Sequence, residues 1–349
     1  MITNPQKFIK IYDINHNILA ELTEYNTLIH DFLLNGMGKC SFNVPMNSIK
    51  CTQLNFQPFN IIEIWNSINC VWWGVIAFAV PVGSVLNVSC YDYTYLLQKT
   101  TAIGETITNK TIQVVMANEV ANFNKASGRV APTIRPILIQ HNIDANTSMF
   151  ASVTYNDDNC YSRLTTICTS FNYDFNVDVN FCFNYYSYMG ANKSKYSINY
   201  GTKHDNVTTD PTYSQDTSSM ANAITYNGAV LVQNIPSQNI YGIIGAPTTV
   251  SPTTGETQAD ILNAVNAEQQ RLAFPSVGIQ CNIIDSNLCP FSDMFIGDSV
   301  TVNFPAYWGF NQPMRIIELD FDDMACLCTV TLGNIVYKPA KPQQKIYAI

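Results

Sequence analysis

The chain has 349 residues, long enough for two or three domains with cores of their own, and 47% of them are hydrophobic, which argues against a disordered chain. Only 13% are charged and the formal net charge is -8, a balance that argues against a nucleic-acid-binding face. Much of the surface must therefore be Asn, Thr, Ser and Tyr, which lose water easily and suit burial against partner proteins. A codon bias toward Asn, Ile and Tyr explains the same composition equally well.

Neither a secretion signal nor a membrane span is expected. The N-terminus, Met1 to Pro5, has no apolar core, and the longest nearly apolar run, Val71 to Val82, is too short to cross a bilayer. We therefore expect the chain to be made, folded and assembled in a cytoplasm. The eleven cysteines are odd in number and lie in a large chain, so free buried thiols are expected rather than a disulfide framework.

The first hundred residues alternate between apolar and polar positions and predict antiparallel strands. Turns are expected at Asn15 to Asn17, Asn35 to Gly38 and Asn66 to Asn69. The expected strands are Phe8 to Asp13, Ile18 to Thr23, Cys40 to Pro45, Phe59 to Ile68, Val71 to Val80 and Val85 to Tyr93.

Helical spacing follows in three places, where apolar residues recur every three or four positions. The expected helices are Ile112 to Phe123, Asp158 to Phe171 with Asp157 or Asp158 as its cap, and Thr257 to Leu272.

The residues between and after these helices again have a pattern typical of strands. A polar, turn-rich segment from Gly201 to Ser219 is expected to be a mobile loop, and Ala246 to Gly255 a linker. The expected strands are Phe175 to Phe183, Tyr196 to Tyr200, Ala223 to Val232, Ile296 to Phe304, Ile317 to Phe321 and Cys326 to Leu332.

These elements predict a mainly β chain with a few helices, in the α+β class. The two separated blocks of strands predict a first β domain over residues 1–97 and a second over residues 172–335, which includes inserted loops and the helix over 257–272. Residues 98–171 form a helical and linker insertion between them, and residues 336–349 an extended C-terminal tail.

No residues with the pattern of a catalytic, cofactor or metal site emerge from the sequence. His16, His30, His141 and His204 each lie without a nearby carboxylate or cysteine at ligand spacing, which favours surface or structural roles. The absence of a phosphate-binding loop, a nucleophile elbow and an HExxH helix points the same way. We therefore expect no catalytic, cofactor-binding or metal-binding residues, no cofactor and no enzymatic activity.

Cysteine and aspartate pairs have simpler explanations than chemistry. Cys326 and Cys328 would point from one strand into the core, which is typical of a buried apolar row. The acidic pairs Asp157-Asp158 and Asp322-Asp323, together with Asp320, are explained by helix caps and turns.

Six short stretches, in order between residues 8 and 335, carry a resemblance to known proteins. They are GMGKCSFNVP at Gly36 to Pro45, WWGVI at Trp72 to Ile76, CYDYTYLL at Cys90 to Leu97, FIGDSVTV at Phe295 to Val302, MRIIEL at Met314 to Leu319 and VTLG at Val330 to Gly333. Together they resemble the baseplate-hub and tail-tip proteins of tailed phages. That family includes the N-terminal modules of tail-associated lysins and the hubs of contractile injection systems.

This resemblance implies that the two β domains are tail-tube-like sandwiches or barrels. It further implies a homotrimer whose six domains form a pseudo-sixfold ring at the tip or baseplate of a virion tail. Such a hub joins the tail tube to the tip or spike and lines the channel through which DNA passes. The acidic net charge suits DNA that passes without specific binding.

The partners implied are a tail-tube or distal-tail ring protein, a tip spike or fibre protein and a tape-measure protein. Receptor binding and cell-wall digestion would belong to other subunits, because the chain stops soon after the hub-like region. The proline-spaced tail Lys338 to Ile349 is expected to dock on another subunit.

Two other functions remain open from the sequence. The chain could be a different tail component, such as a distal-tail protein or a carbohydrate-binding receptor-recognition protein that uses Trp72, Trp73 or Trp308 as a sugar platform. A peptidoglycan hydrolase is the third alternative, for which no catalytic residues can be assembled from the sequence.

Overall fold

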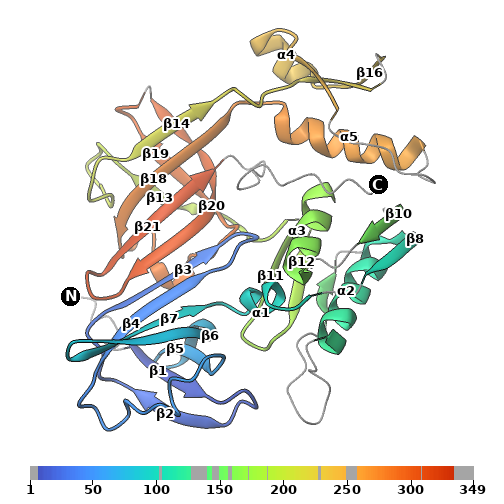
Figure 1. The fold of residues 1–349 in the computed structure, drawn as a ribbon. Helices are drawn as coiled ribbons and strands as arrows, with labels where there is room; N and C mark the ends of the chain where they lie inside the picture. Colours follow the sequence, from blue (N-terminus) through green and yellow to red (C-terminus); the bar gives the residue numbers. More distant parts are fainter. Residues whose placement is uncertain are drawn as a thin grey trace.

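The computed structural model describes residues 7–101, 104–126, 140–143, 149–155, 159–171, 173–186, 188–226, 229–248, 258–307 and 309–333. Across these ranges the fold is mainly β with a few helices, as the sequence predicts. Figure 1 shows two blocks of strands stacked along one side of the molecule and most helices along the other. No helix in the described ranges is long and apolar enough to cross a bilayer.

The first block contains seven strands joined largely by hairpins. They are β1 (Lys7–Tyr12), β2 (Ile18–Leu22), β3 (Leu28–Leu33), β4 (Lys39–Pro45), β5 (Ile61–Asn66), β6 (Asn69–Val82) and β7 (Val85–Tyr91). The turns expected around His16 and Ser67 are confirmed, and both residues adopt positive φ there. β3 was not predicted, because His30 and Asp31 interrupt its apolar pattern.

The helical insertion follows the first block and packs against it. Its elements are α1 (Thr94–Gln98), β8 (Glu105–Thr111), α2 (Ile112–Ala126), β9 (Gln140–Ile143), β10 (Met149–Tyr155), α3 (Cys160–Phe171), β11 (Asp174–Val177) and β12 (Phe183–Tyr186). The buried faces of α2 and α3 share one core with Tyr12, Ile61 and Val75 of the first block. The helices expected over Ile112 to Phe123 and Asp158 to Phe171 are therefore confirmed.

Two details of this insertion differ from the expectation. The cap of α3 is Asn159, whose Oδ1 accepts the Ser162 N–H at 2.7 Å, and Asp157 and Asp158 lie outside the described residues. Phe175 to Phe183 is not one strand but a hairpin, because the Asp178 carboxylate accepts the N–H groups of Asn180 and Cys182 and closes a turn.

A small module with a core of its own lies beyond the second block in Figure 1. It contains β15 (Ala223–Tyr226), β16 (Ala229–Gln233), α4 (Ile235–Tyr241), β17 (Gly245–Pro247) and α5 (Gln258–Leu272). The third predicted helix is confirmed as α5. The stretch Ala223 to Val232 forms the β15–β16 hairpin rather than one strand.

The second block contains six strands and one 3₁₀ turn. They are β13 (Asn192–Asn199), β14 (Thr212–Asp216), β18 (Ser276–Ile284), η1 (Phe291–Asp293), β19 (Ser299–Phe304), β20 (Phe310–Asp322) and β21 (Leu327–Gly333). β14 lies inside the segment expected to be a mobile loop, so that expectation is wrong. Its side chains are mostly exposed and polar, which hides the apolar alternation that marks a strand.

The cysteines are all free thiols, and seven of the eleven are buried. The expectation that Cys326 points into the core is wrong, because Cys326 lies exposed in the β20–β21 turn with φ +54°. Cys328 faces the core as expected. The expected common orientation of the two sulfurs fails because the turn is longer than the sequence suggests.

Apart from β2, which pairs with β1 at the end of the first block, the two blocks have the same strand order, although β1 pairs antiparallel with β5 and β13 pairs parallel with β19. The first runs β3-β4-β7-β6-β5-β1 and the second runs β14-β18-β21-β20-β19-β13. Antiparallel pairing of β3 with β20 joins them into one sheet. Figure 1 shows this seam midway between the blocks.

The domain limits at residues 97, 171 and 335 stay predictions, as does the superposition of the two blocks. The tail over residues 336–349 lies outside the described residues.

Candidate functional site

Two histidines have carboxylate partners that the sequence did not reveal. The His16 ring stacks on Tyr12, and its Nε2 lies 3.1 Å from Oε1 of the buried Glu63. The expectation that these histidines lack a carboxylate partner is wrong for His16 and for His30. Their partners, Glu63 and Asp323, lie far away in the sequence, so ligand spacing could not reveal them. His204 lies in an exposed loop, and the His141 side chain lies outside the described residues.

His30 lies in a closely packed, buried environment. Its ring is buried, it stacks on Phe321 at 5.2 Å, and its Nδ1 lies 3.3 Å from Oδ2 of Asp323, which also pairs with Lys7. Burial lowers the pKa of His30, because an imidazolium loses its water there. Within the described ranges, no group of three or more His, Cys, Asp or Glu side chains is placed to hold a metal ion.

The tryptophans that could have formed a sugar platform are occupied with packing. Trp72 is fully buried, and its Nε1 donates to the Asp31 carbonyl at 3.0 Å. Trp73 packs against the helical core, and its Nε1 donates to the Val177 carbonyl at 2.9 Å. Trp308 lies outside the described residues.

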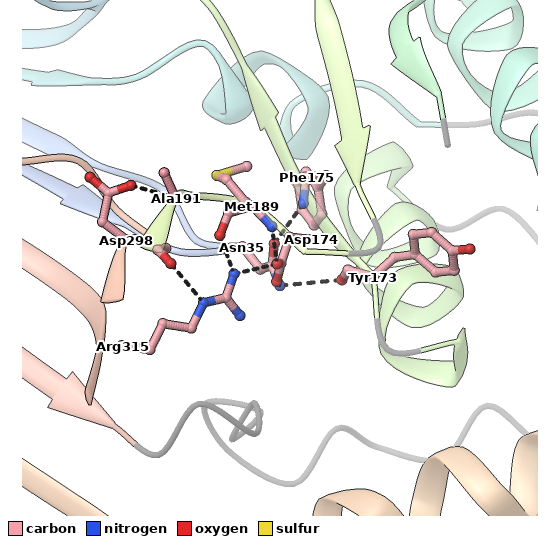
Figure 2. Close-up of polar contacts among 9 residues, drawn as sticks. Asn35, Tyr173, Asp174, Phe175, Met189, Ala191, Asp298 and Arg315 are labelled. Atoms are coloured by element: carbon pink, nitrogen blue, oxygen red, sulfur yellow. Dashed lines mark hydrogen bonds and ion pairs between the residues drawn. The ribbon is translucent and has the colours of Figure 1, made fainter. Parts of the chain in front are cut away.

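The most elaborate polar site is a buried junction between the two blocks and the insertion (Figure 2). At its centre the guanidinium of Arg315, on β20, pairs with the carboxylate of Asp174, on β11. Both side chains are almost fully buried, at 2% and 4% exposure. Arg315 also donates to the carbonyls of Gly297 at 3.1 Å and Met189 at 2.7 Å. The ion pair is thus supplied with the further hydrogen bonds that a buried charge needs.

Asn35 ties the first block into this junction. It follows β3, with φ +54°, and its Nδ2 donates to Oδ1 of Asp174 at 3.1 Å. Its Oδ1 accepts the Phe175 N–H at 2.7 Å, and its carbonyl accepts the Tyr161 hydroxyl at 3.1 Å. One turn residue therefore contacts β11 and α3 together.

The turn before β19 meets the segment before β13 at the same place. Oδ1 of Asp298 accepts the Ala191 N–H at 2.7 Å, and its Oδ2 lies 2.9 Å from Nζ of Lys193. Gly190 and Gly297 have φ of +97° and +86°, and their backbones touch so closely that a Cβ on either would lie 2.1–2.3 Å from the other segment. Only glycine fits these positions.

Three of the stretches that resemble phage hub proteins meet at this junction. Gly36 to Pro45 begins beside Asn35, Phe295 to Val302 contributes Gly297 and Asp298, and Met314 to Leu319 contributes Arg315. Gly297, Asp298 and Arg315 from two of these stretches therefore help to hold the blocks and the insertion together. An arginine inside an apolar strand was the sequence signal that could have revealed the junction.

The second candidate site is the face of the joined sheet that points away from the two cores. Carboxylates gather on this face across the β3–β20 seam, where Asp31 lies directly opposite Asp320 and next to Glu318. Burial, followed by the charges of Glu318, Asp320 and Asp92, raises the pKa of Asp31 to about 7, although its carboxylate accepts the Lys39 N–H. Burial also raises the pKa of Asp320.

The sheet has open edges where this face ends. β14 pairs with β18 alone among the described strands. β6 pairs with β5 only as far as Val75, and Ile76 bonds to Phe59 and Asn60 just before β5, so one edge of Phe78 to Val82 has no described partner. Phe78, Val80 and Val82 are 51%, 47% and 53% exposed. Unpaired apolar edges of this kind are sites of association.

Comparison with solved structures identifies the fold. A 43 kDa tail protein of prophage MuSo2 from Shewanella oneidensis is similar with a TM-score of 0.66 and 14% identity, over 94% of this chain and 98% of that one. The prophage tail protein gp18 from Listeria monocytogenes EGD-e is similar with a TM-score of 0.61 and 14% identity, over 95% of both chains. The chain has the fold of phage tail proteins.

A further match extends the fold to secretion systems. The Escherichia coli c3393 protein, a type VI secretion component described as similar to the phage T4 tail proteins gp27 and gp5, matches with a TM-score of 0.55 and 10% identity. The match covers 90% of this chain and 74% of that protein. No protein-family profile and no curated sequence matches. The fold is therefore one that phage tail proteins and a type VI secretion component share.

Replacing Arg315 with methionine should destabilise the protein by about 3–5 kcal/mol, because Asp174 would be left buried without its counter-charge. The free energy of unfolding, from denaturant titration, measures the effect. Lys193→Met is the matched control, because it also removes an ion pair with an aspartate, Asp298, but Lys193 is partly exposed. This substitution should lower the free energy of unfolding by less than about 1 kcal/mol. Equal losses in the two variants would contradict the central role of Arg315.

Gly190→Ala should be far more destabilising than Gly309→Ala. Both residues have positive φ, but no atom lies within 4 Å of a Cβ at Gly309, whereas a Cβ at Gly190 would overlap the Gly297 backbone. The control should cost about 1–2 kcal/mol for its backbone conformation alone, and Gly190→Ala should exceed it by at least 2 kcal/mol. Thermal unfolding of both variants separates steric overlap from backbone strain, and similar melting temperatures would refute the close approach.

Asp31→Asn should stabilise the protein at pH 8 and leave it nearly unchanged at pH 4. The folded state holds the Asp31 proton up to a pKa of about 7 while the unfolded chain releases it near 3.8, so stability falls as pH rises through that window. The difference between these two pKa values corresponds to a gain of about 4 kcal/mol at pH 8. Glu21→Gln, which replaces an exposed carboxylate on β2, is the control variant to be measured at the same two pH values.

Proposed function

We propose that the chain is a structural hub at the tip or baseplate of a phage tail, and not an enzyme. Three copies form a ring in which the two β blocks of each chain occupy six similar positions. The ring joins the tail tube or distal-tail ring protein to a tip spike or fibre protein, and its channel passes DNA and contacts the tape-measure protein. The virion tail is its location.

One observation carries this proposal. The two blocks repeat one strand order and are already joined side by side by β3 and β20 in a single sheet. A chain that contains two similar units side by side can match a sixfold partner with three copies, since closed symmetry requires each unit to meet an equivalent neighbour.

The acidic face supports the role of the channel. Apart from Lys39 and the buried Arg315, the charged side chains on the face of β3, β4, β14 and β20 opposite the cores are carboxylates. They are Asp31, Asp216, Glu318, Asp320 and Asp322. A negative lining repels phosphates, so DNA would slide past without binding.

The tail proteins with this fold support the location, and the burial of Trp72 and Trp73 speaks against the sugar-platform alternative. The junction around Arg315 and the two paired histidines also fit a scaffold, because their polar groups are consumed by packing contacts.

Imaging of the assembled tail tests the proposal. Averaged images viewed along the tail axis should show three copies of this chain with six similar lobes around a central hole. One copy or six copies around the axis would contradict the proposed hub. Density for the chain at the receptor-binding periphery, away from the axis, would favour a carbohydrate-binding or other tail component instead.

A further inference from the structure

We infer that the ring closes by antiparallel pairing of β14 of one copy with the outer half of β6, Phe78 to Val82, of the next copy. This inference rests on the proposed ring and adds the surface, the partner and the register. Its basis is an internal comparison, because the chain already contains one example of the contact.

β6 and β20 are equivalent strands at the level of single residues. β6 pairs with β7 through Ile76–Cys90, shifts register, and continues from Phe78–Ser89 to Val82–Val85. β20 pairs with β21 through Ile316–Leu332, shifts register, and continues from Glu318–Thr331 to Asp322–Leu327. The irregularity falls at the same place, so Phe78 corresponds to Glu318 and Val82 to Asp322.

The two strands differ in what covers their other edge. In β20 the five residues after the irregularity pair with five residues of β3, from Glu318–Leu33 to Asp322–Ile29. In β6 the equivalent five residues have no described partner. The sheet therefore has one filled and one empty position of the same kind.

The strand that should fill the empty position is also identified by equivalence. β14 pairs antiparallel with β18 in the second block, just as β3 pairs antiparallel with β4 in the first. In the chain, β3 follows β1 and β2, and β14 follows β13. β3 crosses to the other block and covers β20, whereas the outer edge of β14 is open among the described strands. β14 has five residues, as many as the open stretch of β6 requires.

The register follows from the two ladders. Ile29 lies opposite Ser41 of β4, and Thr212 lies opposite Gln280 of β18. Ser41 pairs with Ser89, the partner of Phe78, and Gln280 pairs with Thr331, the partner of Glu318. Ile29 and Thr212 therefore occupy equivalent positions. Transferring the β3–β20 register gives the intermolecular pairs. They are Phe78–Asp216, Ala79–Gln215, Val80–Ser214, Pro81–Tyr213 and Val82–Thr212. Pro81 has no N–H, so the Pro81–Tyr213 pair lacks the hydrogen bond that a backbone N–H would donate at the equivalent position of Phe321.

A second copy suits these edges better than an unrelated strand, because one open edge belongs to the second block and the other to the first, with β18, β21, β20, β3, β4 and β7 between them in the joined sheet. A head-to-tail contact that uses two different ends of each copy generates a closed ring when the rotation permits. The contact would also reduce the exposure of Phe78, Val80 and Val82, whose side chains lie on the same face as those of the equivalent Glu318, Asp320 and Asp322. Val80 would face Ser214, so this seam lacks the opposed carboxylates of Asp31 and Asp320.

Disulfide trapping tests the register. Val80→Cys and Ser214→Cys are combined in a Cys326→Ser background, which removes the exposed native thiol. Directly opposite residues place their Cα atoms about 4.5–5.5 Å apart, within reach of a disulfide. Air oxidation of the purified protein should give a covalent trimer on non-reducing gels, whereas either single cysteine variant should give none.

A second pair, Val82→Cys with Asp216→Cys, is the matched control. Both positions lie on the same strands and the same face, but the inferred register sets them four residues apart, about 13 Å, which a disulfide cannot span. Preferential cross-linking of this control pair would overturn the register.

Light scattering on the same samples separates the two levels of the argument. Trimers in solution that resist cross-linking at Val80 and Ser214 would overturn the inferred contact while the proposed hub stands. A protein that stays monomeric at high concentration and forms no cross-link would also overturn the contact, and the axial image of the tail would then decide the hub by itself.

Discussion

The architecture depends on one buried ion pair, between Arg315 and Asp174. Neither charge could stay in this dry site alone, because the water that each loses on folding must be replaced by protein groups. The guanidinium therefore donates to the carbonyls of Gly297 and Met189. The carboxylate accepts hydrogen bonds from Nδ2 of Asn35 and from the Met189 N–H. Satisfying one pair brings together β20, β11, the turn after β3 and the two glycine turns.

The glycines at this junction show why the requirement is strict. Gly190 and Gly297 let two backbone segments meet at distances that no side chain permits. Asp298 then holds the contact from both sides, through the Ala191 N–H and the Phe295 N–H. The relative position of the insertion and the second block is thereby set by backbone geometry and hydrogen bonds, and apolar packing fills the space around them.

The two long strands β6 and β20 have contrasting chemistry at equivalent positions. β20 carries Glu318 and Asp320 where β6 carries Phe78 and Val80. The acidic residues lie at a seam that the fold of one chain holds closed, so the repulsion at Asp31 can be tolerated there. The apolar residues are about half exposed on an edge of β6 that no described strand pairs with, and association with a second molecule would reduce that exposure.

The sequence by itself determined the class of the fold, the early hairpins and the three main helices, because those depend on local periodicity and turn residues such as His16 and Ser67. It missed β3 and β14, whose polar side chains do not alternate with apolar ones, and it left His16 and His30 without their partners. Glu63 and Asp323 reach those histidines only through pairing between distant strands. The junction of Arg315, Asp174 and Asn35 joins residues 139 to 280 positions apart, and only the tertiary structure could decide which buried charge meets which.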